Sequence, residues 1–267
     1  GSGIFFKQAS VLDSAGSTFM ALLAWILAGI ITLTAGLTIA EIGAQMPYTG
    51  GLYVYIEKIY GRVLGFMAGW MQAIVYGPAM IAAVTGFLSI MVTNLFGIGT
   101  EWRIPIGLIT IIAIGGLNFL ENKVGAAFAI ITTIAKMIPI FAIIFCGICW
   151  GEQNAVAQTV TELNRSTGGL GVAVLAALFA YDGWIFIANL GGEIKNPQKL
   201  LPKAIIIGIT TVLVIYALIT IGIFSFIPAD KIHALGKNST TYLADAILGP
   251  IGGKVPVSYT HLTLPTI

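Results

Sequence analysis

Long uncharged stretches dominate the chain, and the polar positions gather in the short segments between them. A helix that crosses a bilayer needs about 20 mostly apolar residues, and several stretches reach or approach that length. These stretches cover residues 14–40, 63–100, 104–120, 124–151, 168–192 and 204–228. We expect Ile4–Ala9 to be the end of one further helix that is incomplete in this chain. The pattern therefore predicts an all-α polytopic membrane protein.

One of these stretches, 168–192, carries a carboxylate near its middle, at Asp182, and a glycine directly after it. A charge at that depth costs about 2.5–3.5 kcal/mol on insertion scales. Gly183 weakens the helix further, because glycine is flexible and has no side chain to pack. The stretch is longer than one crossing requires, which leaves room for an unwound segment at Phe179–Gly183. Since irregular backbone in a bilayer must be buried or line a cavity, we predict a broken helix with a site at the break.

Two interpretations of this break remain open. In the first, the helix is only kinked, and a neighbouring hydroxyl or Lys136 satisfies the carboxylate of Asp182. In the second, the break ends a half-helix whose free carbonyls attract a cation such as a substrate ammonium.

Lys136 lies far from both ends of the stretch 124–151. The lysine side chain is too short to carry its charge from there to either surface. The charge must be paired, hydrated in a cavity, or lost by deprotonation. Lys136 is therefore either a structural lysine that ties two helices together or a functional cation.

The chain opens on Gly1-Ser2-Gly3-Ile4, which by itself is a weak signal because such a sequence is common in cloning remnants. As native sequence, it supplies flexible backbone before a short helix, whose free N–H groups would favour an anion. Two Gly-interrupted helices in corresponding positions of two halves are typical of inverted-repeat transporters. Together the two breaks would suit a zwitterion, with its carboxylate at the first break and its ammonium at the second.

The composition narrows the class of protein. The chain has 267 residues, of which 57% are hydrophobic and 9% charged, against about 25% charged in a soluble domain. A net charge of +2 gives no indication of nucleic-acid binding. The sequence contains no P-loop, dinucleotide fingerprint or metal-ligand cluster, and no second intramembrane carboxylate that could act with Asp182. We therefore expect neither an enzyme nor a cofactor or metal.

Three segments resemble one transporter family. GSGIF at 1–5 resembles the broken first helix of the amino acid–polyamine–organocation (APC) superfamily of permeases. AEIGAQMPYTGGLYVYIEKIYG at 40–61 is similar to that family's loop after helix 2. FAYDGWIFIANLGGEIKNPQKLLPKAI at 179–205 resembles helix 6 and the following loop of its L-amino-acid transporter branch, and in particular of bacterial serine/threonine exchangers.

The resemblance implies the LeuT-type inverted-repeat fold, represented by its first seven helices only, with helix 1 incomplete. Residues 1–254 would form this partial transporter domain, and the tail 255–267 is expected to be non-native and without a fixed place. Residues 41–62 and 193–203 would face the cytoplasm.

The resemblance also implies a substrate-binding site made largely of backbone. The substrate carboxylate would meet N–H groups of the Gly1-containing motif, at Ser2, Gly3 and Ile4. The ammonium would meet carbonyls of Phe179, Ala180 and Gly183. Three side chains would shape the pocket or gate around the substrate's own side chain: Tyr181, Asp182 and Trp184. Lys136 matches a gating or coupling lysine of sodium-independent members.

We therefore expect a multi-pass plasma-membrane protein that exchanges small neutral amino acids such as serine and threonine by alternating access, without sodium. The same-class alternative is a proton-coupled permease for cationic amino acids or polyamines, with Asp182 as counter-ion. The different-class alternative is a non-transporting binding or assembly subunit. The expected partners are a small amino acid and the lipid bilayer, and an accessory subunit stays unknown.

Overall fold

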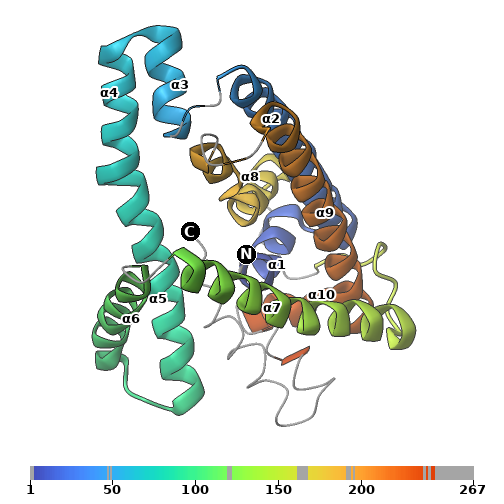
Figure 1. Ribbon diagram of the computed structural model, residues 1–267. Helices are drawn as coiled ribbons and strands as arrows, with labels where there is room; N and C mark the ends of the chain where they lie inside the picture. Colours follow the sequence, from blue (N-terminus) through green and yellow to red (C-terminus); the bar gives the residue numbers. More distant parts are fainter. Residues whose placement is uncertain are drawn as a thin grey trace.

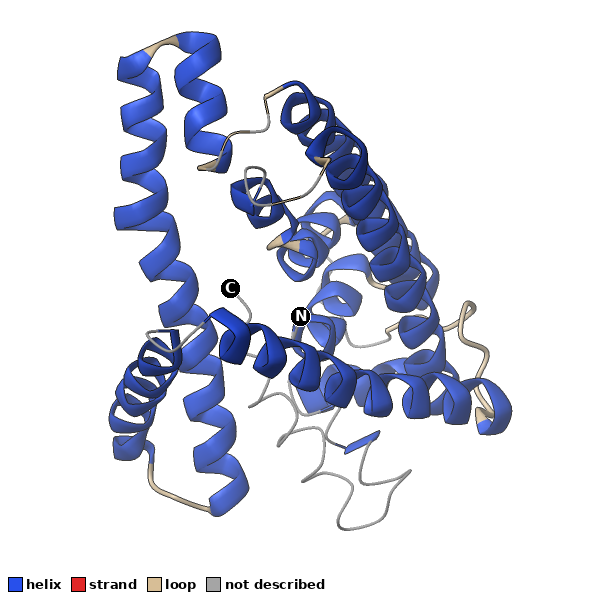
Figure 2. Ribbon diagram, in the orientation of Figure 1, coloured by secondary structure: helices blue, strands red, loops and turns tan. Residues whose placement is uncertain are grey.

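The computed structural model describes residues 3–46, 48, 50–118, 122–160, 168–190, 194, 196–236, 239 and 242–243. Helices make up these residues almost entirely, joined by loops and one isolated bridge between Ser17 and Thr159 (Figure 2). The elements are α1 Gly3–Ala15, α2 Thr18–Gln45, α3 Gly51–Tyr60, α4 Arg62–Trp70, the π-helix η1 Met71–Tyr76, α5 Gly77–Phe96, the 3₁₀-helix η2 Thr100–Trp102, α6 Arg103–Asn118, α7 Asn122–Trp150, α8 Leu170–Tyr181, the 3₁₀-helix η3 Trp184–Leu190, α9 Pro197–Phe226 and α10 Ala229–Leu235. The prediction of an all-α protein is confirmed.

Four helices in the described part of the chain are long and apolar enough to cross a membrane: Thr18–Gln45, Arg62–Ile90, Ile130–Trp150 and Pro197–Phe226. The sequence predicted more spans than these. Of the remaining two stretches, 104–120 overlaps the 16-residue α6, which ends at Asn118, and 168–192 is interrupted after the 12-residue α8.

The predicted ends of several helices were wrong by a few residues. Helix α2 continues to Gln45 rather than residue 40, and α9 begins at Pro197 rather than residue 204. Helix ends do not follow the apolar boundary, because polar side chains suit a helix that emerges from the bilayer. Proline is also favoured in the first turn, where its missing N–H costs nothing.

Helices α2 and α9 form an antiparallel pair, seen side by side in Figure 1. Three glycines of α2 spaced seven residues apart meet α9 residues of decreasing number: Gly29 meets Leu213, Gly36 meets Ile209 and Ile205, and Gly43 meets Leu201. Small residues allow two helices to approach closely in a membrane, where there is no hydrophobic drive between them. A seven-residue spacing keeps such a stripe on one face of the helix.

Helices α1 and α8 are also antiparallel. Gly3, at the start of α1, contacts Ala180 near the end of α8, while Ser14, near the end of α1, contacts Gly168 just before α8. The consecutive helices α1 and α2 thus pair with the consecutive helices α8 and α9. Inverted-repeat transporters place their substrate site at an interface between two sets of helices.

The core of the molecule lies among these four helices and α7. Its largest fully buried side chains include Trp25 of α2 and Phe224 of α9, together with Ile4 of α1. Helix α7 joins this core through Gly147, whose position for a Cβ would lie 2.5 Å from the Cα of Gly222 on α9.

The continuous helix α4–η1–α5 stands to one side of this core in Figure 1. Its outward side chains are strongly apolar, as are those of α6: Val63 is 74% exposed and Ile104 75%. Exposed apolar surface on this scale is a liability in water, whereas it is the normal lipid-facing surface of a membrane protein. The tail 255–267, predicted to have no fixed place, lies outside the described residues.

Candidate substrate site

The helix predicted to be broken is broken. Helix α8 ends at Tyr181, Asp182 is extended (φ −64°, ψ 157°), and the 3₁₀-helix η3 begins at Trp184. Gly183 has a φ of 106°, a left-handed conformation that residues with a Cβ rarely adopt. The irregular segment is therefore Asp182–Gly183, shorter than the predicted Phe179–Gly183. Phe179, Ala180 and Tyr181 remain helical, because nothing before Asp182 requires a non-helical backbone.

The start of the first helix is less irregular than predicted. Gly3 and Ile4 already belong to the first turn of α1, while Gly1 and Ser2 lie outside the described residues. Backbone N–H groups in a first turn have no partner within their own helix, so those of Gly3 and Ile4 have the predicted donor character. The side chain of Ile4 is fully buried, which leaves only its backbone for any ligand.

The two helix ends lie against each other. A Cβ at Gly3 would lie 2.8 Å from both the Cα and the Cβ of Ala180, one residue before the end of α8. The start of a helix carries about +0.5 of a charge and its end about −0.5. The fold therefore brings a donor-rich positive end next to an acceptor-rich negative end. That one amino acid bridges the two ends across a shared cavity stays a prediction.

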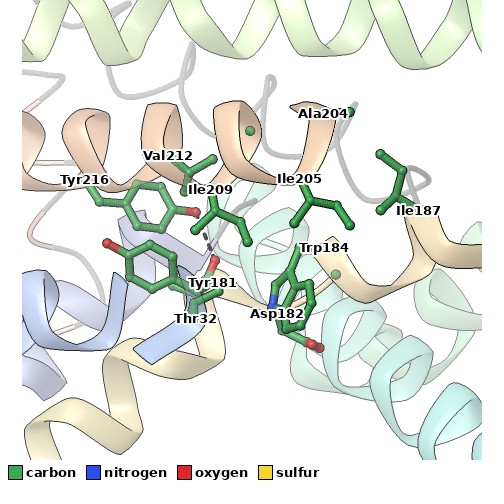
Figure 3. Close-up of a pocket in the computed structure, with 13 residues that line it drawn as sticks. Thr32, Tyr181, Asp182, Trp184, Ile187, Ala204, Ile205, Ile209, Val212 and Tyr216 are labelled. Atoms are coloured by element: carbon green, nitrogen blue, oxygen red, sulfur yellow. Dashed lines mark hydrogen bonds between the residues drawn. The ribbon is translucent and has the colours of Figure 1, made fainter. Parts of the chain in front are cut away.

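A cavity of about 280 Å³ adjoins the break, between α2, the α8–η3 segment and α9 (Figure 3). Five of the predicted substrate-binding residues line it: Ala180, Tyr181, Asp182, Gly183 and Trp184. Three others lie outside its lining: Gly3, Ile4 and Phe179. The opposite wall is formed by α9, including Ile205, Gly208 and Ile209. Sequence reasoning gave no indication that α9 contributes to the site.

Two tyrosines fix one end of this cavity. The hydroxyl of Tyr216 donates to the Ala180 carbonyl at 2.9 Å, and the Tyr181 hydroxyl donates to the Trp25 carbonyl at 3.1 Å. The rings of Trp25 and Tyr216 pack edge to face with centroids 5.6 Å apart. Tyr181 is thus a buried, fixed wall residue. The Ala180 carbonyl, predicted to meet the ammonium, has one of its two acceptor positions occupied by Tyr216.

Phe179 makes a different contact. The Nζ of Lys7 on α1 lies 4.9 Å from the centre of the Phe179 ring, within the range of a cation–π interaction. This contact is a second link between α1 and the end of α8, next to Gly3 and Ala180.

The carboxylate of Asp182 accepts a hydrogen bond from the hydroxyl of Tyr76, the last residue of η1. This contact matches the interpretation in which a neighbouring hydroxyl satisfies Asp182. Tyr76 was missed from the sequence, although Gly77 and Pro78 directly after it signal an irregular helix at this point.

Lys136 lies at the middle of the 29-residue α7, as predicted, but its side chain is outside the described part of the structure. Pro139 follows within the same helix. Because proline has no N–H, it leaves the carbonyl four residues earlier, at Ala135, without its helical partner. The backbone beside Lys136 therefore has a carbonyl without its usual helical donor.

We expect replacement of Lys136 by alanine to reduce amino acid flux at least about tenfold while leaving expression intact. The reason is its mid-helix position, where a lysine must be paired, hydrated in a cavity or deprotonated. Uptake of labelled amino acid into proteoliposomes measures the effect, with Lys58→Ala on α3 as the matched control. Unchanged flux across an acidic-to-neutral pH series would leave Lys136 a packing residue.

The sequence matches the family model for amino acid permeases over residues 1–257. It is 45% identical to the serine/threonine exchanger SteT of Bacillus subtilis over 96% of this chain and 58% of that protein. It is 28% identical to the human cystine/glutamate transporter over 96% of this chain and 52% of that protein. It is also 31% identical to the mouse large neutral amino acids transporter small subunit 2, over 97% of this chain and 50% of that protein.

The chain thus spans about half the length of the curated relatives it matches. The family match covers nearly all of the chain, including both helix ends at the candidate site. These matches agree with the predicted multi-pass protein of the plasma membrane. The chain belongs to the amino acid permease family.

Proposed function

We propose that the permease containing this chain exchanges small neutral amino acids across the plasma membrane, independently of sodium and by alternating access. One observation carries the proposal furthest: the start of α1 contacts the end of α8 beside the break at Asp182–Gly183. Free N–H groups at one end and carbonyls at the other suit the carboxylate and ammonium of a single amino acid.

The recognising groups are largely backbone, so they fix the part that all amino acids share. The choice among side chains then falls to the residues around the break, chiefly Tyr181, Asp182 and Trp184. The Bacillus subtilis relative is named a serine/threonine exchanger, which supports a small neutral substrate. Lys136, in the helix that the resemblance associates with coupling, supports independence from sodium.

The proposal is tested with the full-length permease that contains this chain, called the uninterrupted permease below, in proteoliposomes loaded with unlabelled serine. We expect labelled serine to enter only when an exchangeable amino acid is inside, and at the same rate when potassium replaces sodium. Uptake that needs no internal amino acid and follows an imposed proton gradient would contradict exchange. Reconstitution without any partner protein also tests the non-transporting subunit alternative, because flux under those conditions excludes it.

The proton-coupled permease for cationic amino acids or polyamines remains the second candidate, because the side chain of Asp182 is exposed at the break. A carboxylate there would pair with a cationic substrate side chain. Competition of labelled serine uptake by unlabelled lysine and putrescine separates the two candidates. Stronger inhibition by lysine or putrescine than by unlabelled serine would favour the second.

Replacing Asp182 by asparagine is expected to lower the preference for serine over alanine by several-fold while both remain exchangeable. The amide still accepts a hydrogen bond from a substrate hydroxyl, but a charge-assisted bond is about twice as strong as a neutral one. The ratio of kcat/KM for labelled serine and alanine measures the change. Glu101→Gln, at an exposed carboxylate on η2, is the matched control. An unaltered ratio would mean that Asp182 does not contact the substrate side chain.

A further inference from the structure

Tyr76 touches both sides of the break. Its hydroxyl donates to the carboxylate of Asp182, directly before Gly183. Its ring centre lies 6.1 Å from that of Phe186, on the far side of Gly183, at an interplanar angle of 37°. A residue of a distant helix therefore bridges the end of α8 and the start of η3.

The local sequence explains why Tyr76 faces the break. Residues Met71–Tyr76 form a π-helix, in which the Gly77 N–H donates to the carbonyl of Gln72, five residues earlier. Pro78 has no N–H, so the carbonyl of Ile74 loses the partner it would have in an α-helix. The wider turn changes the direction of the side chains that follow. Such π turns within α-helices occur frequently at functional sites.

The carboxylate of Asp182 has room for a second donor. An ionised carboxylate offers about four acceptor positions, and a single tyrosine hydroxyl occupies one. The Asp182 side chain is exposed rather than enclosed by the core. Within a membrane such a group strongly favours any donor that reaches it.

We propose that Tyr76 determines side-chain specificity, because its hydroxyl donates a hydrogen bond to Asp182 when the substrate has no hydroxyl to donate one. This inference rests on the proposed exchange of small neutral amino acids. When serine or threonine occupies the break, its hydroxyl donates to a second acceptor position of the Asp182 carboxylate, beside the Tyr76 hydroxyl. When the substrate has no hydroxyl, the Tyr76 bond remains. Tyr76 thereby keeps the site tolerant of both kinds of substrate.

The proposal predicts that loss of the Tyr76 hydroxyl increases the preference for serine over alanine. Without the Tyr76 hydroxyl, an aliphatic substrate leaves the Asp182 carboxylate without a donor, whereas serine still supplies one. A site whose polar group is left unpaired discriminates against the substrate that lacks the matching group. Tyr76→Phe should therefore raise the KM for alanine about tenfold and change that for serine less than about threefold. This shift is opposite to the one expected for Asp182→Asn.

The experiment measures KM for labelled L-serine and L-alanine in the uninterrupted permease, for the wild type and Tyr76→Phe. Tyr60→Phe is the matched control, since Tyr60 lies on α3 and is 68% exposed. A Tyr76→Phe/Asp182→Ala double variant completes the test: with the carboxylate absent, loss of the Tyr76 hydroxyl should no longer change the serine-to-alanine ratio.

Equal changes in both KM values for Tyr76→Phe would overturn the inference and leave Tyr76 a structural contact. An undiminished effect of Tyr76→Phe without the Asp182 carboxylate would overturn it as well. Neither result affects the proposed function, which fails separately if the wild type does not exchange serine.

Discussion

Replacing Gly3 by valine is expected to abolish exchange of every amino acid tested. A Cβ at this position would lie 2.8 Å from the Cα of Ala180, and backbone cannot move aside as a flexible side chain can. The start of α1 would be forced away from the end of α8, which separates the N–H groups from the carbonyls that we propose hold one zwitterion. Binding of labelled serine and alanine to the purified, uninterrupted permease measures the loss.

The matched control is Gly171→Val on α8, because a Cβ at Gly171 meets nothing within 4 Å. This variant makes the same chemical change in a membrane helix and should retain exchange. Normal serine affinity in Gly3→Val, with the protein folded, would remove the contact between the two helix ends from the proposed mechanism.

A second large effect is expected at the contact between α7 and α9. Replacing Gly147 by valine should prevent α7 from packing on α9, because the position for a Cβ is 2.5 Å from the Cα of Gly222. Overpacking a filled interface usually costs about 1–3 kcal/mol, and a backbone overlap on both helices places this variant at the upper end. We expect a clear fall in the melting temperature of the detergent-purified permease.

The control for this change is Gly116→Val on α6, where a Cβ meets nothing within 4 Å. Its melting temperature should stay close to that of the wild type. If Gly147→Val melted at the same temperature as Gly116→Val, the close approach of α7 and α9 would not stabilise the native protein.

The features that could be predicted from the sequence are those that depend on neighbouring residues in the chain. The break at Asp182 and Gly183 follows from a charge and a flexible residue within an apolar run, and the structure confirms it. The seven-residue spacing of Gly29, Gly36 and Gly43 is visible in the sequence, although it does not show which helix packs against them.

The features that could not be predicted depend on how distant helices rotate against each other. The hydrogen bond between Tyr76 and Asp182 joins residues 106 positions apart. Tyr216 reaches the Ala180 carbonyl only because α9 lies antiparallel to α2 beside the break. Apolar membrane helices have little amphipathic pattern that would indicate such rotations, so the facing side chains emerge only from the assembled structure.

The π turn at Met71–Tyr76 has a consequence for how this family can change its length. Such a turn holds more residues than an α turn, so it behaves as a one-residue insertion that the helix absorbs without breaking. Deleting one residue there would let the turn return to α geometry while α4 and α5 keep their orientation relative to each other. Helix α4 would keep its contact with α3, where Gly65 packs against Glu57, and only the side chains within the turn would change direction. Gain or loss of a single codon at this turn would therefore change the side chain that contacts the break, without any substitution in the break itself.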